Sequence, residues 1–220
     1  MDSFGTFWSD SDSVGRAVTL LLLAMSVSAW VTILWKVWVL QRARHDVARA
    51  VPAFWAAPGL DEGRQRLAEI DREQVLLPLL DASMATPLPG TLDSGAHLDS
   101  QLTRRLRDAL HRGLAHLQFG QVLLASIGST APFIGLFGTV WGIYHALASI
   151  AAAGTITIDK VAGPVGEALI MTAAGLAVAI PAVLAYNLFG KWVGAAEAEL
   201  EGFAHDLREM RLDQQRPQGA

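Results

Sequence analysis

The sequence predicts an all-α integral membrane protein with three transmembrane helices, two of them prolonged into a cytoplasmic helical region. The chain has 220 residues, of which 52% are hydrophobic and only 17% charged, so a large apolar surface must be buried in protein or in lipid. The apolar residues gather into three runs, 17–40, 122–153 and 161–189. Each run exceeds the roughly 20 residues that cross the hydrocarbon core of a bilayer.

The first run predicts a retained transmembrane helix rather than a cleaved secretory signal. It is 24 residues long, its N-terminal flank is acidic, and no cleavage site with small residues follows it. Trp30, Trp35 and Trp38 lie toward its end, where amphipathic rings favour the level of the lipid headgroups. The same rings could also be aromatic residues of a protein core.

Basic residues near the ends of the runs predict the orientation in the membrane. Only Arg16 and Lys160 flank the runs on one side. The other side carries Arg42, Arg44, Arg49, Arg104, Arg105, Arg107, Arg112, Lys191, Arg208, Arg211 and Arg216. We therefore expect a periplasmic N-terminus (1–16), a first span (17–40), a cytoplasmic helical region (41–121), a second span (122–151), a periplasmic loop (152–160), a third span (161–189) and a cytoplasmic C-terminal helix and tail (190–220).

Composition and motifs exclude several classes of function. The chain has no cysteine, which rules out disulfides and thiolate metal sites, and its net charge of -4 argues against a nucleic-acid partner. We find no cluster of metal ligands, no nucleophile elbow and no phosphate-binding loop. The sequence therefore predicts neither an enzyme nor a cofactor.

The segment between the first two runs predicts helices broken by turns over 52–96, followed by an amphipathic helix from His97. The apolar stripe of that helix consists of Leu98, Leu102, Leu106, Leu110, Leu114 and Leu117. We see no turn signal after it and expect one continuous helix over 97–150, roughly 80 Å long. Arg104, Arg105 and Arg107 are expected to form a solvated face near anionic headgroups. A second amphipathic pattern after 189 predicts that the third span also extends into the cytoplasm.

Small residues recur in the second and third runs at helical spacing. Glycine weakens a helix, but in lipid it allows the backbone of another helix to approach closely. We therefore expect close packing within this hairpin and between subunits. The residues expected to carry it are Gly135, Gly138 and Gly142 in the second span and Ala168, Gly175 and Ala179 in the third.

Glu167 is the only carboxylate within the three runs. Burying a charged carboxylate in hydrocarbon costs at least a few kcal/mol. Because burial favours the protonated form of a carboxyl, Glu167 could take up and release protons as its access to water changes. Two alternatives stay open: Glu167 could be solvated near the outer surface, or it could form a structural hydrogen bond with a neighbouring helix.

Three further groups of polar residues lie inside the runs. Thr139 and Thr172 could supply hydroxyl groups to a proton pathway, but they could equally donate to backbone carbonyls of their own helices. Thr172 is five residues from Glu167, about 140° around a helix, so the two need not share one face. Lys36 is expected to extend to the cytoplasmic interface, and His145 to lie at the outer interface.

The segments "GSTAPFIGLFGTVWGIYHAL" (128–147) and "KVAGPVGEALIMTAAGLAVAIPAVLAYN" (160–187) resemble the MotA/TolQ/ExbB proton-channel family, and look most like its ExbB branch. The resemblance is strong over 120–192. It implies a subunit of an inner-membrane motor that uses the proton-motive force, with ExbD, to energise TonB-dependent import of siderophores, haem or vitamin B12 across the outer membrane.

The resemblance also implies an assembly and a set of site residues. It implies a homo-oligomer, a pentamer, around single-span ExbD helices, with TonB and the lipid bilayer as further partners. The acid and threonines that line the interior in the family fall here on Glu167, Thr139 and Thr172. The nearest alternative is a TolQ-like subunit that energises envelope constriction, and a more distant one is a passive membrane scaffold.

Overall fold

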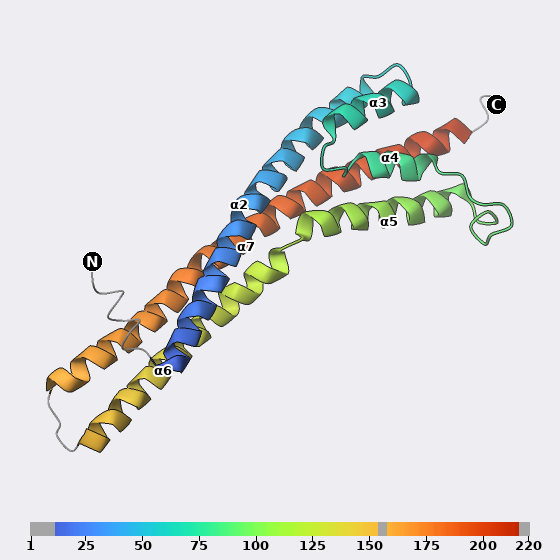
Figure 1. The fold of residues 1–220 in the computed structure, drawn as a ribbon. Helices are drawn as coiled ribbons and strands as arrows, with labels where there is room; N and C mark the ends of the chain where they lie inside the picture. The colour runs from blue at the N-terminus through green and yellow to red at the C-terminus, as the bar shows by residue number, and fades with distance from the viewer. Residues whose placement is uncertain (1–11, 154–157, 216–220) are drawn as a thin grey trace. The chain divides into compact units, whose positions relative to one another are not determined.

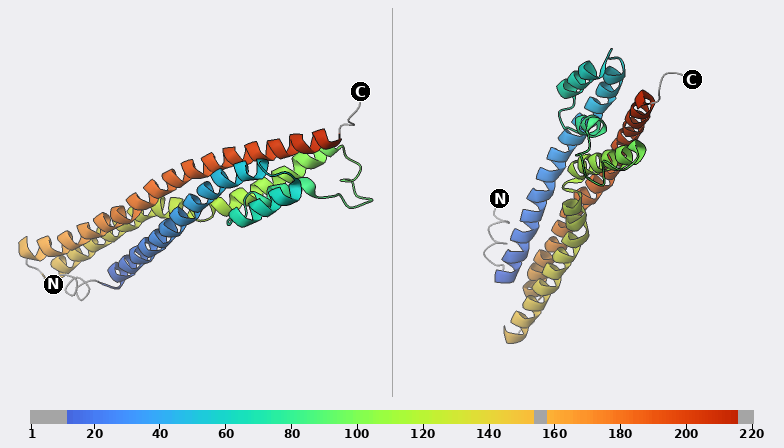
Figure 2. Two further views of the ribbon diagram at one scale, coloured as in Figure 1. Left: turned by 90° about the horizontal axis from the view of Figure 1, so that it is seen from above. Right: turned by 90° about the vertical axis from the view of Figure 1, so that its right-hand side faces the viewer.

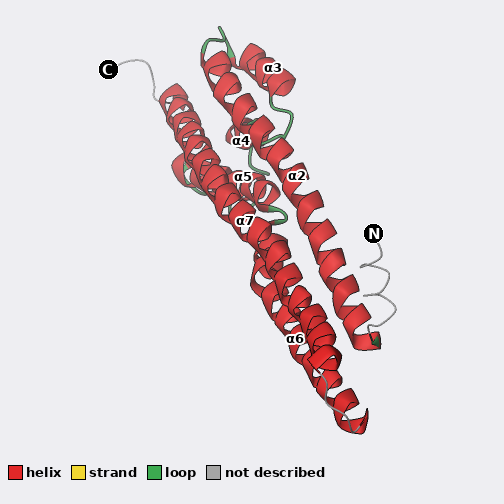
Figure 3. Ribbon diagram, turned by 90° about the vertical axis from the view of Figure 1, so that its left-hand side faces the viewer, coloured by secondary structure: helices red, strands yellow, loops and turns green. Residues whose placement is uncertain are grey.

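The computed structural model describes residues 12–153 and 158–215, and these residues form helices and loops without a strand (Figure 3). The helices are α2 (Ser13–Trp55), α3 (Leu60–Ile70), α4 (Leu77–Met84), α5 (Leu98–Gln118), α6 (Gln121–Ala153) and α7 (Ile158–Gln215), shown in Figure 1. By length and composition, α2, α6 and α7 can each cross a membrane. The predicted all-α class with three spans is confirmed. The expected N-terminus, periplasmic loop and tail fall partly on 1–11, 154–157 and 216–220, outside the described residues.

The chain divides into two compact units. Unit 1 comprises Met1–Trp35 and Gly120–Leu188, and unit 2 comprises Lys36–Phe119 and Phe189–Ala220. In unit 1, α6 and the first part of α7 run side by side (Figures 1 and 2). Small residues such as Ala131, Ala168 and Ala182 are buried there, whereas Leu34 is 66% and Phe133 70% exposed. A unit with small residues inside and large apolar residues outside matches a lipid or subunit environment.

Unit 2 has an interior of large side chains, as expected of a water-soluble region. The fully buried residues include Leu67, Leu79, Leu102 and Phe203. Helix α4 contacts both α3 and α5. The buried Asp71 carboxylate accepts hydrogen bonds from the amides of Val75, Leu76 and Leu77, so it satisfies the backbone donors at the start of α4.

The expected continuous helix over 97–150 is wrong, because the chain breaks between α5 and α6 at Phe119 and Gly120 (the α5–α6 break). Phe119 has an extended backbone, with φ -51° and ψ 136°, and Gly120 has φ +82°. These values match a type II turn, whose second central position requires a positive φ and therefore favours glycine. The helices that run on well beyond the apolar segments are α2 and α7, which contain the first and third spans. The expected extension of the third span is therefore confirmed, and the expected extension of the second span is not.

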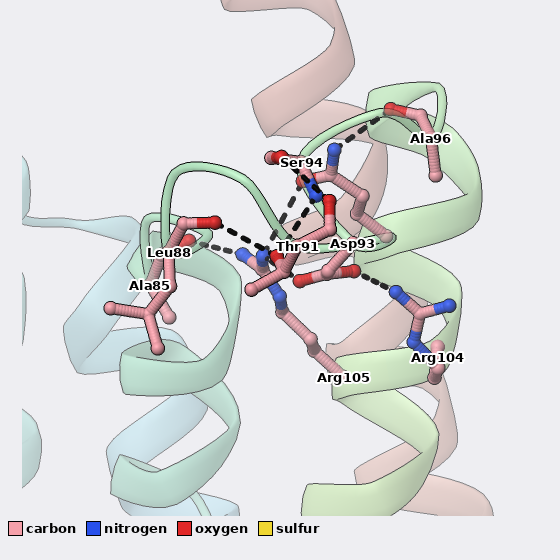
Figure 4. A network of polar contacts seen from close by, with 9 residues as sticks. Ala85, Leu88, Thr91, Asp93, Ser94, Ala96, Arg104 and Arg105 are labelled. Carbon is pink, nitrogen blue, oxygen red and sulfur yellow. Dashed lines mark hydrogen bonds and ion pairs between the residues drawn. The ribbon is translucent and has the colours of Figure 1, made fainter.

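The arginines at the start of α5 bind the preceding loop rather than forming an open basic face. The carboxylate of Asp93 pairs with Arg104 and Arg105, and Arg105 also donates to the carbonyl oxygen of Ala85 (Figure 4). The side chain of Arg105 is only 15% exposed. The expectation of a solvated face is therefore wrong for Arg105, whose guanidinium is held by the chain itself, whereas the side chain of Arg104 is 54% exposed.

Candidate functional site

The contact between α6 and α7 in unit 1 is a backbone-to-backbone approach at two glycines. A methyl group built on Gly135 would lie 2.6 Å from the carbonyl oxygen of Met171 and 3.1 Å from the Cα of Gly175. A methyl group on Gly175 would lie 2.6 Å from the carbonyl oxygen of Ala131. Backbone atoms of a helix cannot move aside as a flexible side chain can, so both positions require glycine.

The other small residues named from the sequence continue this contact in both directions. A methyl group on Gly142 would lie 3.0 Å from the Cβ of Ala168, and one on Gly138 would lie 2.5 Å from the sulfur of Met171 and 3.0 Å from Val18 of α2. Ala179 is buried, at 4% exposed. Gly128, another glycine of the second span, is as close to Val183 as Gly138 is to Met171, at 2.5 Å.

Thr139 of α6 and Thr172 of α7 meet within this contact. Their hydroxyl groups form a hydrogen bond with each other, and Thr139 is only 7% exposed. The Oγ1 of Thr139 also lies 2.9 Å from the carbonyl oxygen of Ala168 and 3.1 Å from that of Gly135. Thr139 has a single hydroxyl proton, so when it donates to a carbonyl, Thr172 donates to it. Thr139 thus contacts the backbone of its own helix and also the hydroxyl group of Thr172.

Glu167 lies on α7 beside Ala168 and is half-buried in the single chain. Among the residues that the structure describes, its carboxylate has no hydrogen-bond or ion-pair partner. The structure therefore brings Thr139 and Thr172 together but does not join Glu167 to them. This agrees with the angle of about 140° between positions 167 and 172 of a helix.

The contacts of unit 1 place Glu167 at the same level as the start of α2. The Nε1 of Trp141 lies 2.6 Å from an oxygen of Asp12, directly before α2, and the next residue, Gly142, contacts Ala168. At the other end of the unit, a methyl group on Gly120 would lie 2.9 Å from Thr32 of α2. The helix between Gly120 and Gly142 is about 33 Å long, close to the thickness of a hydrocarbon core. Glu167 is thus near one end of the predicted spans, with the threonine pair about one turn deeper.

Asp12 is a second carboxylate at this level, and sequence reasoning missed it. One of its oxygens accepts from the amide of Gly15 at 2.7 Å and caps α2, while the other accepts from Trp141 of α6. Partial burial alone raises the pKa of Asp12, but the bonds from Trp141 and Gly15 and the charges of His145 and Arg16 outweigh it and hold the pKa below its ordinary value. An Asp before an apolar run indicates a helix cap, but nothing in the sequence indicates Trp141 as its partner.

We expect Asp12→Ala to free the start of α2 and the indole of Trp141, at a cost of about 1–2 kcal/mol near neutral pH. Hydrogen exchange of the Gly15 amide and the Trp141 indole should quicken accordingly. Because the pKa of Asp12 is lowered on folding, its contribution is present above the ordinary carboxyl pKa and is lost as the pH falls through the lowered value. The native protein and the variant should therefore converge only in strong acid. Asp108→Ala, at an exposed position of α5, is the matched control.

The two remaining ionisable candidates differ from each other. His145 is exposed on α6, level with Asp12. Lys36 does not extend to an interface: it is 1% exposed, and its Nζ lies 2.5 Å from the carbonyl oxygen of Leu117 and 2.9 Å from that of Phe119. The expectation for Lys36 is therefore wrong, because backbone oxygens of the chain itself bind the ammonium.

Within the described residues, no group of carboxylates and histidines could hold a metal ion.

These features define a class: a membrane protein of three long helices, with a hydroxyl pair and an acidic residue in a hairpin of small residues. The model of the MotA/TolQ/ExbB proton channel family matches residues 74–202. The chain therefore belongs to the MotA/TolQ/ExbB proton channel family.

Individual relatives agree with this assignment over most of the chain. Biopolymer transport protein ExbB of Xanthomonas campestris pv. campestris is 40% identical over 205 residues, covering 90% of this chain and 81% of the relative. Biopolymer transport protein ExbB of Neisseria meningitidis is 37% identical over 213 residues, covering 94% and 96%. Tol-Pal system protein TolQ of Pseudomonas aeruginosa is 34% identical over 187 residues, covering 82% and 80%.

Proposed function

We propose that this chain is an ExbB-like subunit of a proton-driven motor in the bacterial inner membrane. With an ExbD-like partner, it would use the proton-motive force to energise TonB-dependent import across the outer membrane. One observation carries the proposal: a hydroxyl pair, the buried Thr139 and the half-buried Thr172, lies about one turn from the acidic Glu167 within a hairpin of closely packed helices. Identities of 37 to 40% with ExbB proteins over most of the chain support it.

The proposed proton pathway uses Glu167, Thr139 and Thr172. Protons would reach Glu167 at the outer end of the spans, where its carboxyl exchanges them with water. The hydroxyl groups of Thr139 and Thr172 would then relay protons further into the membrane. Charge movement across a membrane releases roughly 2.3 kcal/mol per elementary charge per 100 mV, enough to drive a conformational step in a partner helix. Only O–H bonds are formed and broken along this pathway, so the proposed role is proton transfer.

The proposed assembly is a homo-oligomer, a pentamer, with the ExbD-like single-span helices in its lumen and TonB as the driven protein. Exposed large apolar residues of unit 1, such as Phe133 and Leu184, support it, since they need cover from lipid or from sister subunits. The proposed topology has a periplasmic N-terminus and a cytoplasmic C-terminus. The excess of basic residues on the side of 41–121 and of the tail supports that orientation.

Complementation tests the proposed role. We expect the chain, expressed with the ExbD-like protein of its own source, to restore siderophore uptake to a Gram-negative strain that lacks both ExbB and TolQ. The alternative is a TolQ-like subunit, which the 34% identity with a TolQ protein supports. This alternative predicts restored envelope constriction without siderophore uptake. Uptake that survives a protonophore would instead favour a passive scaffold.

A further inference from the structure

The ammonium of Lys36 is buried at the α5–α6 break without a carboxylate to pair with. It is 1% exposed, and no ion pair joins it to any residue in the described part of the chain. Its polar contacts are the carbonyl oxygens of Leu117 and Phe119, and it lies 5.9 Å from the ring centroid of Phe189. Carbonyl oxygens at the C-terminus of a helix carry partial negative charge, so the end of α5 supplies the charge that stabilises the ammonium.

The geometry of these two contacts is incompatible with a continuous helix. In an α-helix, carbonyl groups two residues apart point along the axis from positions about 200° apart around it. The oxygens of Leu117 and Phe119 would then face the amides of Gln121 and Leu123. In the structure both converge on one nitrogen atom, because Phe119 has an extended backbone with ψ 136° and Gly120 has φ +82°.

The sequence around the break otherwise favours a helix. The residues from Leu114 to Ala125 contain no proline, and Gly120 is the only glycine among them. Glycine is the residue that adopts positive φ and helical φ most freely, so it permits both conformations of the break. If Lys36 were absent, the carbonyl oxygens of Leu117 and Phe119 would both lose a donor, and a continuous helix would provide new donors for them.

We propose that Lys36 holds the α5–α6 break open, and that the segment 117–123 has two mutually exclusive conformations. In one, the backbone is broken and Lys36 binds the oxygens of Leu117 and Phe119. In the other, α5 and α6 form one helix and Lys36 is released. Lys36 is thus a positioning residue that determines where the membrane helix α6 begins.

Lys36→Met tests the proposal, because methionine keeps a long unbranched side chain, one atom shorter than that of lysine, and removes the charge. The complex with its partner is studied in lipid nanodiscs by NMR with selective labels. We expect the ¹³Cα shift of Phe119 to move from extended to helical values. Hydrogen exchange of the Leu123 amide should slow at least about tenfold, because the amide gains the carbonyl oxygen of Phe119 as an acceptor. Lys191→Met, at an exposed position of α7, is the control. An extended Phe119 in Lys36→Met would overturn the proposal.

Gly120→Ala tests the conformation of 117–123 while Lys36 is still present, in case Lys36→Met does not fold. Alanine disfavours positive φ, and its methyl group would lie 2.9 Å from Thr32, so we expect a helical Phe119. The chain has three lysines, which allows the Nζ signal of Lys36 to be assigned and its hydrogen-bond correlation with the Leu117 carbonyl to be followed. A helical Phe119 with loss of that correlation supports the proposal. A helical Phe119 with the correlation retained, or no correlation in the native protein, overturns it.

Discussion

Glu167→Gln is expected to abolish TonB-dependent siderophore uptake, down to the level of cells that lack the chain, while the protein still inserts and assembles. Glutamine has nearly the same shape as glutamate and can form hydrogen bonds, but it cannot exchange a proton near neutral pH. Glu167 is the only carboxylate within the three apolar runs, so no neighbouring acid in these runs can replace it. Uptake of a labelled siderophore in a complemented strain, with membrane levels measured in parallel, checks this result.

The matched control for this prediction is Glu199→Gln, the same change at an exposed position of α7 in unit 2. It should leave uptake unchanged, which separates loss of the Glu167 carboxyl from a general effect of lowered charge. Normal uptake with Glu167→Gln would refute the role of Glu167 in proton transfer. Loss of the protein from the membrane would instead assign Glu167 a structural hydrogen bond.

Gly175→Ala is expected to cause the largest loss of stability, about 2–3 kcal/mol, because its methyl group would lie 2.6 Å from the carbonyl oxygen of Ala131 and 3.1 Å from the Cα of Gly135. The helices α6 and α7 must separate to admit it, and separation also breaks the hydroxyl pair of Thr139 and Thr172. We expect a lower midpoint of thermal aggregation for the purified complex and a partial loss of uptake.

Gly190→Ala provides the control on the same helix, since a methyl group there meets nothing within 4 Å. Alanine is a better helix former than glycine by roughly 1 kcal/mol, so this variant should be as stable as the native protein or more stable. Equal stability of the two variants would mean that α6 and α7 are further apart than the structure has them.

Much of the fold follows from the sequence, because the length of an apolar run sets the number of spans. The position of the α5–α6 break does not. Gly120 stands alone in a pattern that otherwise favours a helix, and a single glycine is tolerated there. Its positive φ accompanies a close approach to Thr32, and the neighbouring Phe119 accepts a hydrogen bond from Lys36, 83 residues away. Contacts of this separation cannot be inferred from local pattern.

The candidate site, like the fold, could be predicted from the sequence only in part. The small residues around Gly135 and Gly175 could be named from their spacing, because close packing in lipid requires them. The register that brings Thr139 to Thr172, 33 residues away, could not be predicted, because it depends on which glycines of the two helices meet. The contact of Asp12 with Trp141, 129 residues away, has no local sign beyond a helix cap.

The most direct test of the central claim is the protonation of Glu167 in the assembled complex. Infrared difference spectroscopy of the complex with its ExbD-like partner in lipid can follow the C=O stretch of protonated carboxyl groups as the pH changes. We expect a protonated-carboxyl band that responds to pH in the native complex and is absent from Glu167→Gln. An identical spectrum in Glu167→Gln would contradict the account, because Glu167 of the native complex would then contribute no protonated-carboxyl band.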